Sequence, residues 1–189
     1  GTISECYVAN STVIVRNADQ YGGLGTGGFA GTLRQGARIY NSYVYNTEIC
    51  GYGSVAGFAG KDEGTGTILK NCYAAEVTIN TSEAVNADAV TADVGGFMKK
   101  NGKSPSITNC YTTLAGNSND YVATISDKAA IVAGLVTNLA DTKYATSSEI
   151  NNGYPYIKAF VQDATPTPVP TQAPTVAPTT APTATPGNE

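Results

Sequence analysis

The sequence predicts an all-β fold, a parallel β-solenoid of about four degenerate repeats, followed by a disordered Thr/Pro-rich tail. Three observations lead to this prediction. Two short motifs alternate along residues 1–140, charged residues make up 14% of the chain, and seven of the nine prolines lie between residues 164 and 186. Abundant Gly, Thr, Asn, Val and Tyr, with no Trp and one Met, favours strands and turns over helices.

The first motif begins with an aliphatic residue and ends with a tyrosine. Its four copies, at residues 3–7, 39–43, 69–73 and 107–111, read ISECY, IYNSY, LKNCY and ITNCY. The second motif centres on a glycine followed by a bulky apolar residue. Its copies contain Gly28, Phe29 and Gly31; Gly57, Phe58 and Gly60; Gly96 and Phe97; and Gly134 and Leu135.

The spacing between the two motifs divides each repeat into a constant and a variable half. From each Phe to the next motif tyrosine the chain runs 14, 15 and 14 residues, whereas from each such tyrosine to the next second motif it runs 22, 15, 24 and 24. This pattern is typical of solenoids, whose coils superpose while insertions leave on one face. We place the repeats near residues 1–36, 37–66, 67–104 and 105–140.

Residues 141–160 are predicted to form a C-terminal cap, so that residues 1–160 make one domain. Within them, residues 146–157 break the repeat and combine a Gly turn, a Pro and bulky apolar side chains. We expect this segment to cover the last coil and protect its edge. No comparable segment precedes Ile3, which leads us to expect further repeats or domains of the same polypeptide.

Stacked coils place equivalent side chains above one another at about the 4.8 Å strand spacing. We therefore expect an aliphatic column that starts with Ile3 and a second column of Phe29, Phe58, Phe97 and Leu135. The glycines before each Phe indicate a tight corner, where a Cβ would clash or φ is positive. Asn41, Asn71 and Asn109, with Glu5 in the first copy, form either an amide ladder or a row of ordinary turn residues.

The two motifs together resemble the GLUG repeats of large bacterial surface and secreted proteins, including IgA-specific metallopeptidases. The resemblance covers roughly residues 1–140, and both signature glycines are present at 28–31 and 57–60, whereas the copies at Gly96 and Gly134 lack the second. It implies a non-catalytic repeat region within a multidomain exported protein. It brings no catalytic residues with it.

Three of the four cysteines, Cys6, Cys72 and Cys110, occupy the same repeat position, and Ser42 is the fourth member of the series. Stacked cysteines would hold their Cβ atoms about 4.8 Å apart, more than the roughly 3.8 Å of a disulfide. We interpret this column as small buried side chains instead of bridges. Cys50 lies outside the column and has no explanation from the pattern.

The complete absence of His excludes Ser-His-Asp and Cys-His catalysis and most catalytic zinc sites. No EF-hand or CxxC spacing occurs, so we predict no metal and no cofactor. Asp62 with Glu63, and Asp88 with Asp93, are interpreted as exposed loop acids instead of a weak calcium site. The glycine-rich residues 21–28 lack the Lys of a phosphate loop and are interpreted as a corner or loop.

Tyr7, Tyr43, Tyr73 and Tyr111 are the candidate ligand-binding residues. Neighbouring residues of a strand face opposite sides, so an inward Cys column places these rings outward, where an exposed ladder would stack on sugars. The favoured alternative is that a turn at Asn resets the alternation, or that the variable segments fold over the rings and bury them as packing.

Residues 161–189 are predicted to be an extended, semi-rigid linker, with Pro at every fourth position from 170 to 186. We therefore expect a non-catalytic structural or adhesive module of an extracellular or bacterial cell-surface protein. The alternatives are a carbohydrate-binding module that uses the Tyr ladder or the variable loops and, more remotely, a β-helical glycan-active enzyme. Expected partners are host or plant glycans or surface proteins, with no nucleic acid and no membrane span.

Overall fold

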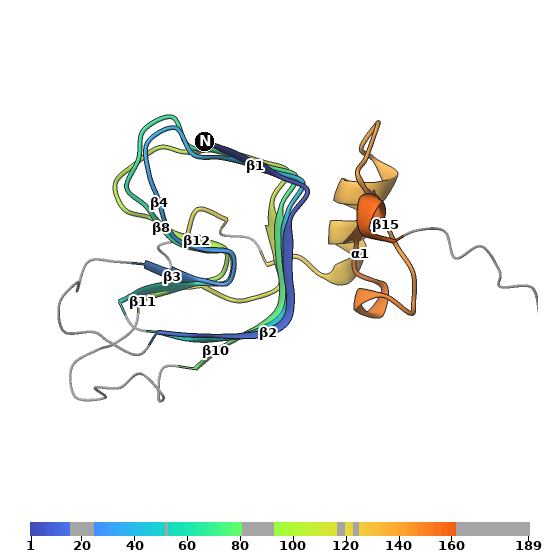
Figure 1. Cartoon of the computed structure of the whole chain (residues 1–189), viewed down its shortest axis with the longest axis horizontal. Helices are drawn as coiled ribbons and strands as arrows, with labels where there is room; N and C mark the ends of the chain where they lie inside the picture. Colours follow the sequence, from blue (N-terminus) through green and yellow to red (C-terminus); the bar gives the residue numbers. More distant parts are fainter. Residues whose placement is uncertain (16–24, 52, 81–92, 117–119, 123–124, 162–189) are drawn as a thin grey trace, which may run out of the picture.

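The computed structural model describes residues 1–15, 25–51, 53–80, 93–116, 120–122 and 125–161. These residues form mostly strands in parallel sheets, together with one short α-helix. The predicted all-β class is therefore confirmed. Figure 1 shows that equivalent strands lie almost on top of one another when the stack is viewed end-on.

Each of the first three repeats contributes one layer of four strands. Layer 1 contains β1 (Thr2–Ser4), β2 (Tyr7–Ile14), β3 (Gly25–Gly27) and β4 (Ala30–Leu33). Layer 2 contains β5 (Arg38–Tyr40), β6 (Tyr43–Cys50), β7 (Ser54–Ala56) and β8 (Ala59–Asp62). Layer 3 contains β9 (Ile68–Lys70), β10 (Tyr73–Asn80), β11 (Asp93–Gly95) and β12 (Met98–Lys99), and β13 (Ser106–Thr108) and β14 (Tyr111–Thr112) begin a fourth layer.

Equivalent strands pair in parallel and in register. The sheet orders are β1-β5-β9-β13, β14-β10-β6-β2, β11-β7-β3 and β12-β8-β4. Ile39 is paired with Ile3 on one side and Leu69 on the other, and Leu69 is paired with Ile107. The aliphatic column predicted from the first motif therefore lies in register across the four layers.

The Asn column is both a row of turn residues and an amide ladder. Glu5, Asn41, Asn71 and Asn109 have φ values of 55°, 47°, 56° and 53°, the left-handed conformation that Asn tolerates best among residues with a Cβ. The Asn71 amide donates to Asn41 Oδ1 at 3.0 Å, and the Asn109 amide donates to Asn71 Oδ1 at 2.9 Å. The two interpretations left open by the sequence are thus both correct.

A second column of left-handed residues bends the long strands in their middle. Asn10, Asn46 and Glu76 have φ values of 51°, 45° and 53°, and the Asn46 amide donates to Asn10 Oδ1 at 2.8 Å. Each lies three residues after a motif tyrosine. This spacing, Tyr-x-x-Asn in two copies and Tyr-x-x-Glu in the third, was available in the sequence and identifies the corner at which β2, β6 and β10 turn (Figure 1).

The Phe column fills the interior of the stack. The rings of Phe29 and Phe58 are stacked with centroids 4.8 Å apart, and those of Phe58 and Phe97 with centroids 4.7 Å apart. Phe58 and Phe97 are fully buried together with the aliphatic column residues Ile39 and Leu69. These side chains form one continuous hydrophobic core enclosed by the layers.

The glycines before each Phe are required by close approach between layers and not by a positive φ. A Cβ on Gly28 would lie 2.6 Å from the carbonyl oxygen of Gly57, and a Cβ on Gly57 would overlap the carbonyl oxygen of Gly96. Gly60 has the same problem against the backbone of Gly25 and Thr26 in the layer above. The second signature glycine therefore serves layer-to-layer packing as well.

We predict that Gly57→Ala lowers the free energy of unfolding by about 1–3 kcal/mol, since the added methyl forces two layers apart. Urea denaturation followed by circular dichroism measures the loss. Gly1→Ala is the control, because a Cβ there meets nothing within 4 Å. A Gly57→Ala variant as stable as this control would contradict the packing role of the glycine column.

The fourth copy of the second motif does not continue the Phe column, so that prediction is wrong. Gly134 and Leu135 lie in a helical turn, η1 (Ala133–Thr137), that follows helix α1 (Lys128–Val132). Leu135 is fully buried, but in a second hydrophobic cluster outside the stack. Gly134 packs against the ring of Tyr111, where a Cβ would overlap the phenol.

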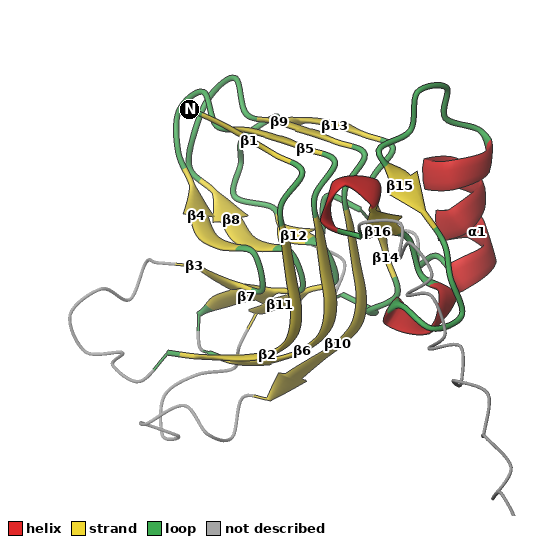
Figure 2. Ribbon diagram, turned by 45° about the vertical axis from the view of Figure 1, so that its right-hand side comes forward, coloured by secondary structure: helices red, strands yellow, loops and turns green. Residues whose placement is uncertain are grey.

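Residues 127–161, here called the covering segment, pack beside the stack and not beyond its last layer. The segment comprises α1, η1, β15 (Tyr144–Ala145), η2 (Asn151–Gly153), β16 (Tyr156–Ile157) and η3 (Lys158–Phe160). It lies across the outer face of the sheet that contains β2, β6 and β10 (Figures 1 and 2). The predicted cap at 141–160 therefore starts too late and covers a lateral face.

The C-terminal end of the stack is instead closed by residues 113–116, 120–122 and 125–126, here called the closing segment. In the inner layers, the N–H groups of Phe29 and Ala30 donate to Phe58 O, and those of Phe58 and Ala59 donate to Phe97 O. In the last layer the carboxylate of Asp120 replaces the missing carbonyl. It accepts from Phe97 N at 2.8 Å and from Met98 N at 3.2 Å. Asp120 thus satisfies donors that no further layer reaches.

Candidate functional site

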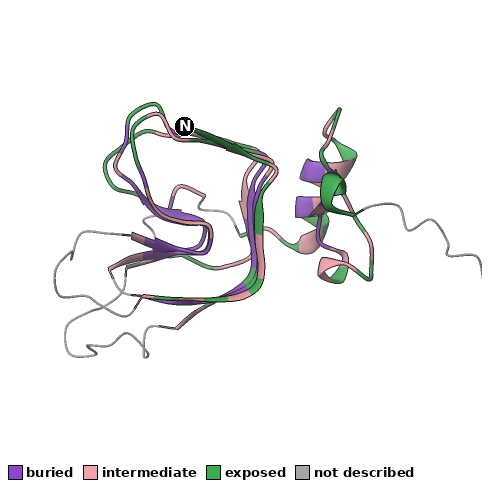
Figure 3. Cartoon of the chain, viewed as in Figure 1, coloured by how far each residue is buried: buried purple, intermediate pink, exposed green. Residues whose placement is uncertain are grey.

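The Tyr column lies on the outer face of the stack, as the alternation predicted, but its middle is buried. Tyr43 is 3% exposed and Tyr73 is 0% exposed, whereas Tyr7 at one end is 46% exposed. The rings of Tyr7, Tyr43 and Tyr73 are stacked, with centroids 5.1 and 5.0 Å apart. Buried residues of the covering segment (Figure 3) belong to the same hydrophobic cluster as Tyr43 and Tyr73. The prediction of an accessible ladder of four tyrosines is therefore wrong, and the alternative, in which the rings are buried by packing, is correct for Tyr43 and Tyr73.

Three phenols fasten the covering segment to the stack. Tyr73 Oη donates to the carbonyl of Pro155, and Tyr144 Oη donates to Asn71 O at 2.8 Å. Tyr154 Oη donates to Glu76 Oε1 at 2.7 Å. These bonds join both left-handed columns to the covering segment. The Tyr face is consequently an intramolecular interface.

Burial raises the pKa of Tyr73 and of Tyr144 well above the ordinary value of a phenol. In the unfolded chain the same phenols ionise near pH 10. Their contribution to stability is therefore complete below about pH 10 and declines as the pH rises above it, by about 1.4 kcal/mol per pH unit for each residue.

Urea midpoints measured between pH 9 and pH 11 test this expectation. Tyr144→Phe removes one of these phenols and should reduce the loss of stability between pH 9 and pH 11 by about 1.4 kcal/mol in total. A slope equal to that of the unsubstituted chain would mean that Tyr144 ionises in the folded protein.

The Cys column is a repeated turn contact. Cys6 Sγ, Cys72 Sγ and Cys110 Sγ each donate to the carbonyl two residues before, at 3.3, 3.3 and 3.4 Å, and Ser42 Oγ makes the same bond at 2.8 Å. This common contact explains why Ser replaces Cys in the second copy. Cys72 is fully buried, but Cys6 is exposed, so the column is buried only in the middle of the stack. Cys50 is buried at the end of β6.

The acids singled out in the sequence do not form one site. Asp62 is fully buried, which corrects its interpretation as a solvated loop acid, and its Oδ1 accepts from Gly64 N and Thr67 Oγ1, both at 2.9 Å. Glu63 lies 2.5 Å from Lys61 Nζ, which lowers the pKa of its carboxyl. Asp88 and residues 21–24 lie outside the described part of the chain. Asp93 falls within β11.

One polar hollow lies on the bend of the long strands. It has a volume of about 360 Å³ and includes Asn10, Asn46 and Glu76 among its lining residues. Its remaining lining is Ser, Thr and Glu from the same three strands. The hollow offers hydrogen-bonding groups without an aromatic platform.

Within the described ranges, no three His, Cys, Asp or Glu side chains gather as metal ligands do. Of the helices that can be described, none has the length and apolar character needed to span a membrane. No family model, curated protein or solved structure matches this chain. The resemblance to GLUG repeats therefore stays a prediction.

Proposed function

We propose that this chain is a β-solenoid module of the GLUG-repeat type with a non-catalytic structural or adhesive role in a secreted or cell-surface bacterial protein. The observation that carries the proposal is the use of every motif column in packing. The Phe column fills the core, the Asn columns shape the corners, and the Tyr column holds the covering segment. These side chains hold the stack together.

The parallel, in-register pairing of equivalent strands supports the solenoid interpretation, because each layer contacts its neighbours through the same residues. A rigid stack followed by a Pro-rich segment would space other domains of the same protein or present them at a surface. Residues 161–189 carry that spacer role in the proposal.

Antibodies against the purified chain should label intact cells of the producing bacterium or its culture medium. Labelling that requires cell lysis would overturn the surface or secreted assignment. A panel of polysaccharides incubated with the chain should yield no cleaved product, and release of oligosaccharides would overturn the non-catalytic assignment.

A glycan array of the full chain separates the structural role from the carbohydrate-binding alternative. We expect no saturable binding. The informative variant is Tyr7→Ala, since Tyr7 is the accessible end of the column, whereas Tyr73→Ala would disturb the fold. Saturable binding that Tyr7→Ala weakens by about tenfold or more would make a carbohydrate-binding module the better assignment.

A further inference from the structure

The four strands of layer 1 form an open edge at one end of the stack. β1, β2, β3 and β4 each occupy the end position of their sheet and have a partner strand on one side only. Ile3, Tyr7 and Ile14, all in these strands, are 45%, 46% and 42% exposed. This end is called the N-terminal face.

The strands of the N-terminal face lack the charges that normally protect a sheet edge. The strands of layer 1 read TIS, YVANSTVI, GTG and AGTL and contain no Asp, Glu, Lys or Arg. Layer 2 carries Arg38, Glu48, Lys61 and Asp62 in the equivalent strands. Proteins usually place charges or prolines on edges that must stay unpaired. The uncharged strands of layer 1 therefore resemble strands that are paired on both sides.

The side-chain columns run up to this face and end there. Tyr7 and Phe29 are the terminal rings of columns stacked within 9° of parallel. The Asn46 amide donates to Asn10 Oδ1. Because this oxygen faces layer 2, the NH₂ group of Asn10 is left to face the other side. An acceptor side chain would meet it only on a layer with the same direction and register.

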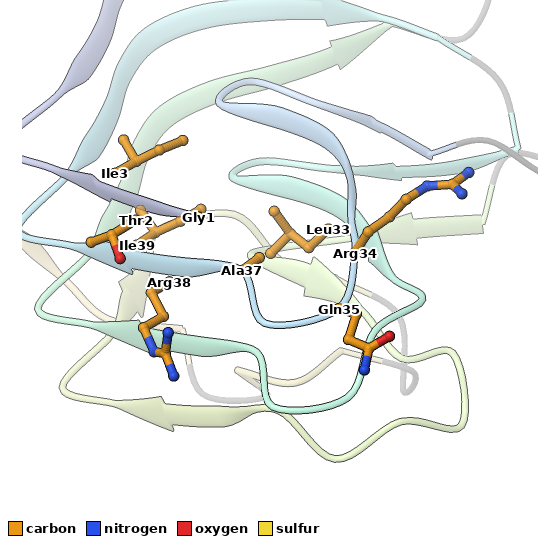
Figure 4. A pocket seen from close by; sticks show the side chains of 9 residues that line it. All are labelled: Gly1, Thr2, Ile3, Leu33, Arg34, Gln35, Ala37, Arg38 and Ile39. Carbon is orange, nitrogen blue, oxygen red and sulfur yellow. The ribbon is translucent and has the colours of Figure 1, made fainter.

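A hollow of about 330 Å³ lies at the same end, between β1 and the turn from β4 to β5. Ile3, Leu33 and Ile39 line it together with Arg34, Gln35 and Arg38 (Figure 4). The hollow exposes the aliphatic column from above. One further aliphatic side chain in that column would occupy part of it.

From these observations we infer that the N-terminal face is a docking site for one more strand–turn–strand layer of the same repeat type, which adds in parallel to β1–β4. The occupant continues the aliphatic column above Ile3, the ring column above Tyr7 and an acceptor above Asn10. A second copy of this chain does not fit the role, because the closing segment with Asp120 covers the face that it would have to present. The inference depends on the geometry of the stack and not on the proposed surface role.

A synthetic peptide that copies residues 37–50, with Cys50→Ser, is the probe, because this segment already pairs with β1 and β2 from the other side. Fluorescence anisotropy with the full chain should show saturable binding at one peptide per chain. Ile3→Lys in the protein, at an exposed position, should weaken binding about tenfold or more. The matched control peptide carries Ile39→Asp and should not bind.

A second measurement covers the case in which a short peptide does not order itself. Residues 37–66 inserted directly before Gly1 keep the register, since Arg38 pairs with Thr2 and Ile68 pairs with Arg38. The extended chain should unfold at a higher urea concentration and show slower amide exchange in β2, with β14 unchanged. Failure of both the peptide and the extended chain would overturn the inference. A concentration-dependent dimer that Ile3→Lys dissociates would overturn it too, since the occupant would then be a second copy.

Discussion

Replacing Phe58 by alanine should lower the free energy of unfolding by about 3–5 kcal/mol, the largest loss expected from one substitution in this chain. Phe58 is fully buried and stacks on a ring above and a ring below. Removal of its ring leaves a cavity between layers whose backbones are hydrogen-bonded on both sides and cannot close around it.

Urea denaturation monitored by circular dichroism measures this loss, with Phe160→Ala as the matched control. Phe160 is 57% exposed and makes one edge contact with Tyr7, so its removal should cost below about 1 kcal/mol. Similar costs for the two phenylalanines would show that the Phe column is not the centre of the core.

Asp120→Ala should destabilise the chain by about 2–5 kcal/mol, since it removes the acceptor of buried N–H groups at Phe97 and Met98. The same carboxylate also accepts from Val122 N at 2.9 Å and holds the closing segment in place. Hydrogen exchange should therefore accelerate at β12 before it does in β6, because the stack opens from its last layer.

Asp120→Asn tests the role of the second carboxylate oxygen. It keeps one acceptor but places an amide NH₂ beside a backbone donor, so the expected loss is intermediate. Glu149→Ala, at an exposed position, should be neutral. A stable Asp120→Ala variant would mean that water replaces the carboxylate.

The repeat spacing was sufficient to predict the all-β class and the columns in layers 1 to 3. It succeeded because each inward position must accept the same side chain in every layer, which places Ile3, Ile39 and Leu69 in register. The prediction failed at Leu135, where four residues imitate the second motif. The missed signal is Asp127, whose carboxylate caps the helix by accepting from Ala130 N at 2.8 Å.

Two further features could not be read from the sequence. The Asp120 carboxylate accepts the hydrogen bonds that a backbone carbonyl accepts in the inner layers. In the sequence alone, such a residue looks the same as an acid in an exposed loop. The burial of Tyr43 and Tyr73 depends on where the covering segment docks. The repeat pattern does not predict that position, because it describes contacts between equivalent residues of neighbouring layers. Burial of the rings was among the predictions, but it was assigned to the variable segments, whereas the C-terminal covering segment buries them.

The docking of the covering segment has a mechanical consequence. Phe160, near the end of the described chain, contacts Tyr7 in the same layer that begins at Gly1, with ring centroids 5.3 Å apart. The covering segment is also hydrogen-bonded to layer 3 through Tyr73, Tyr144 and Tyr154. A pulling force applied between residues 1 and 161 is therefore shared between the first layer and the third, and does not act on one end of the stack alone.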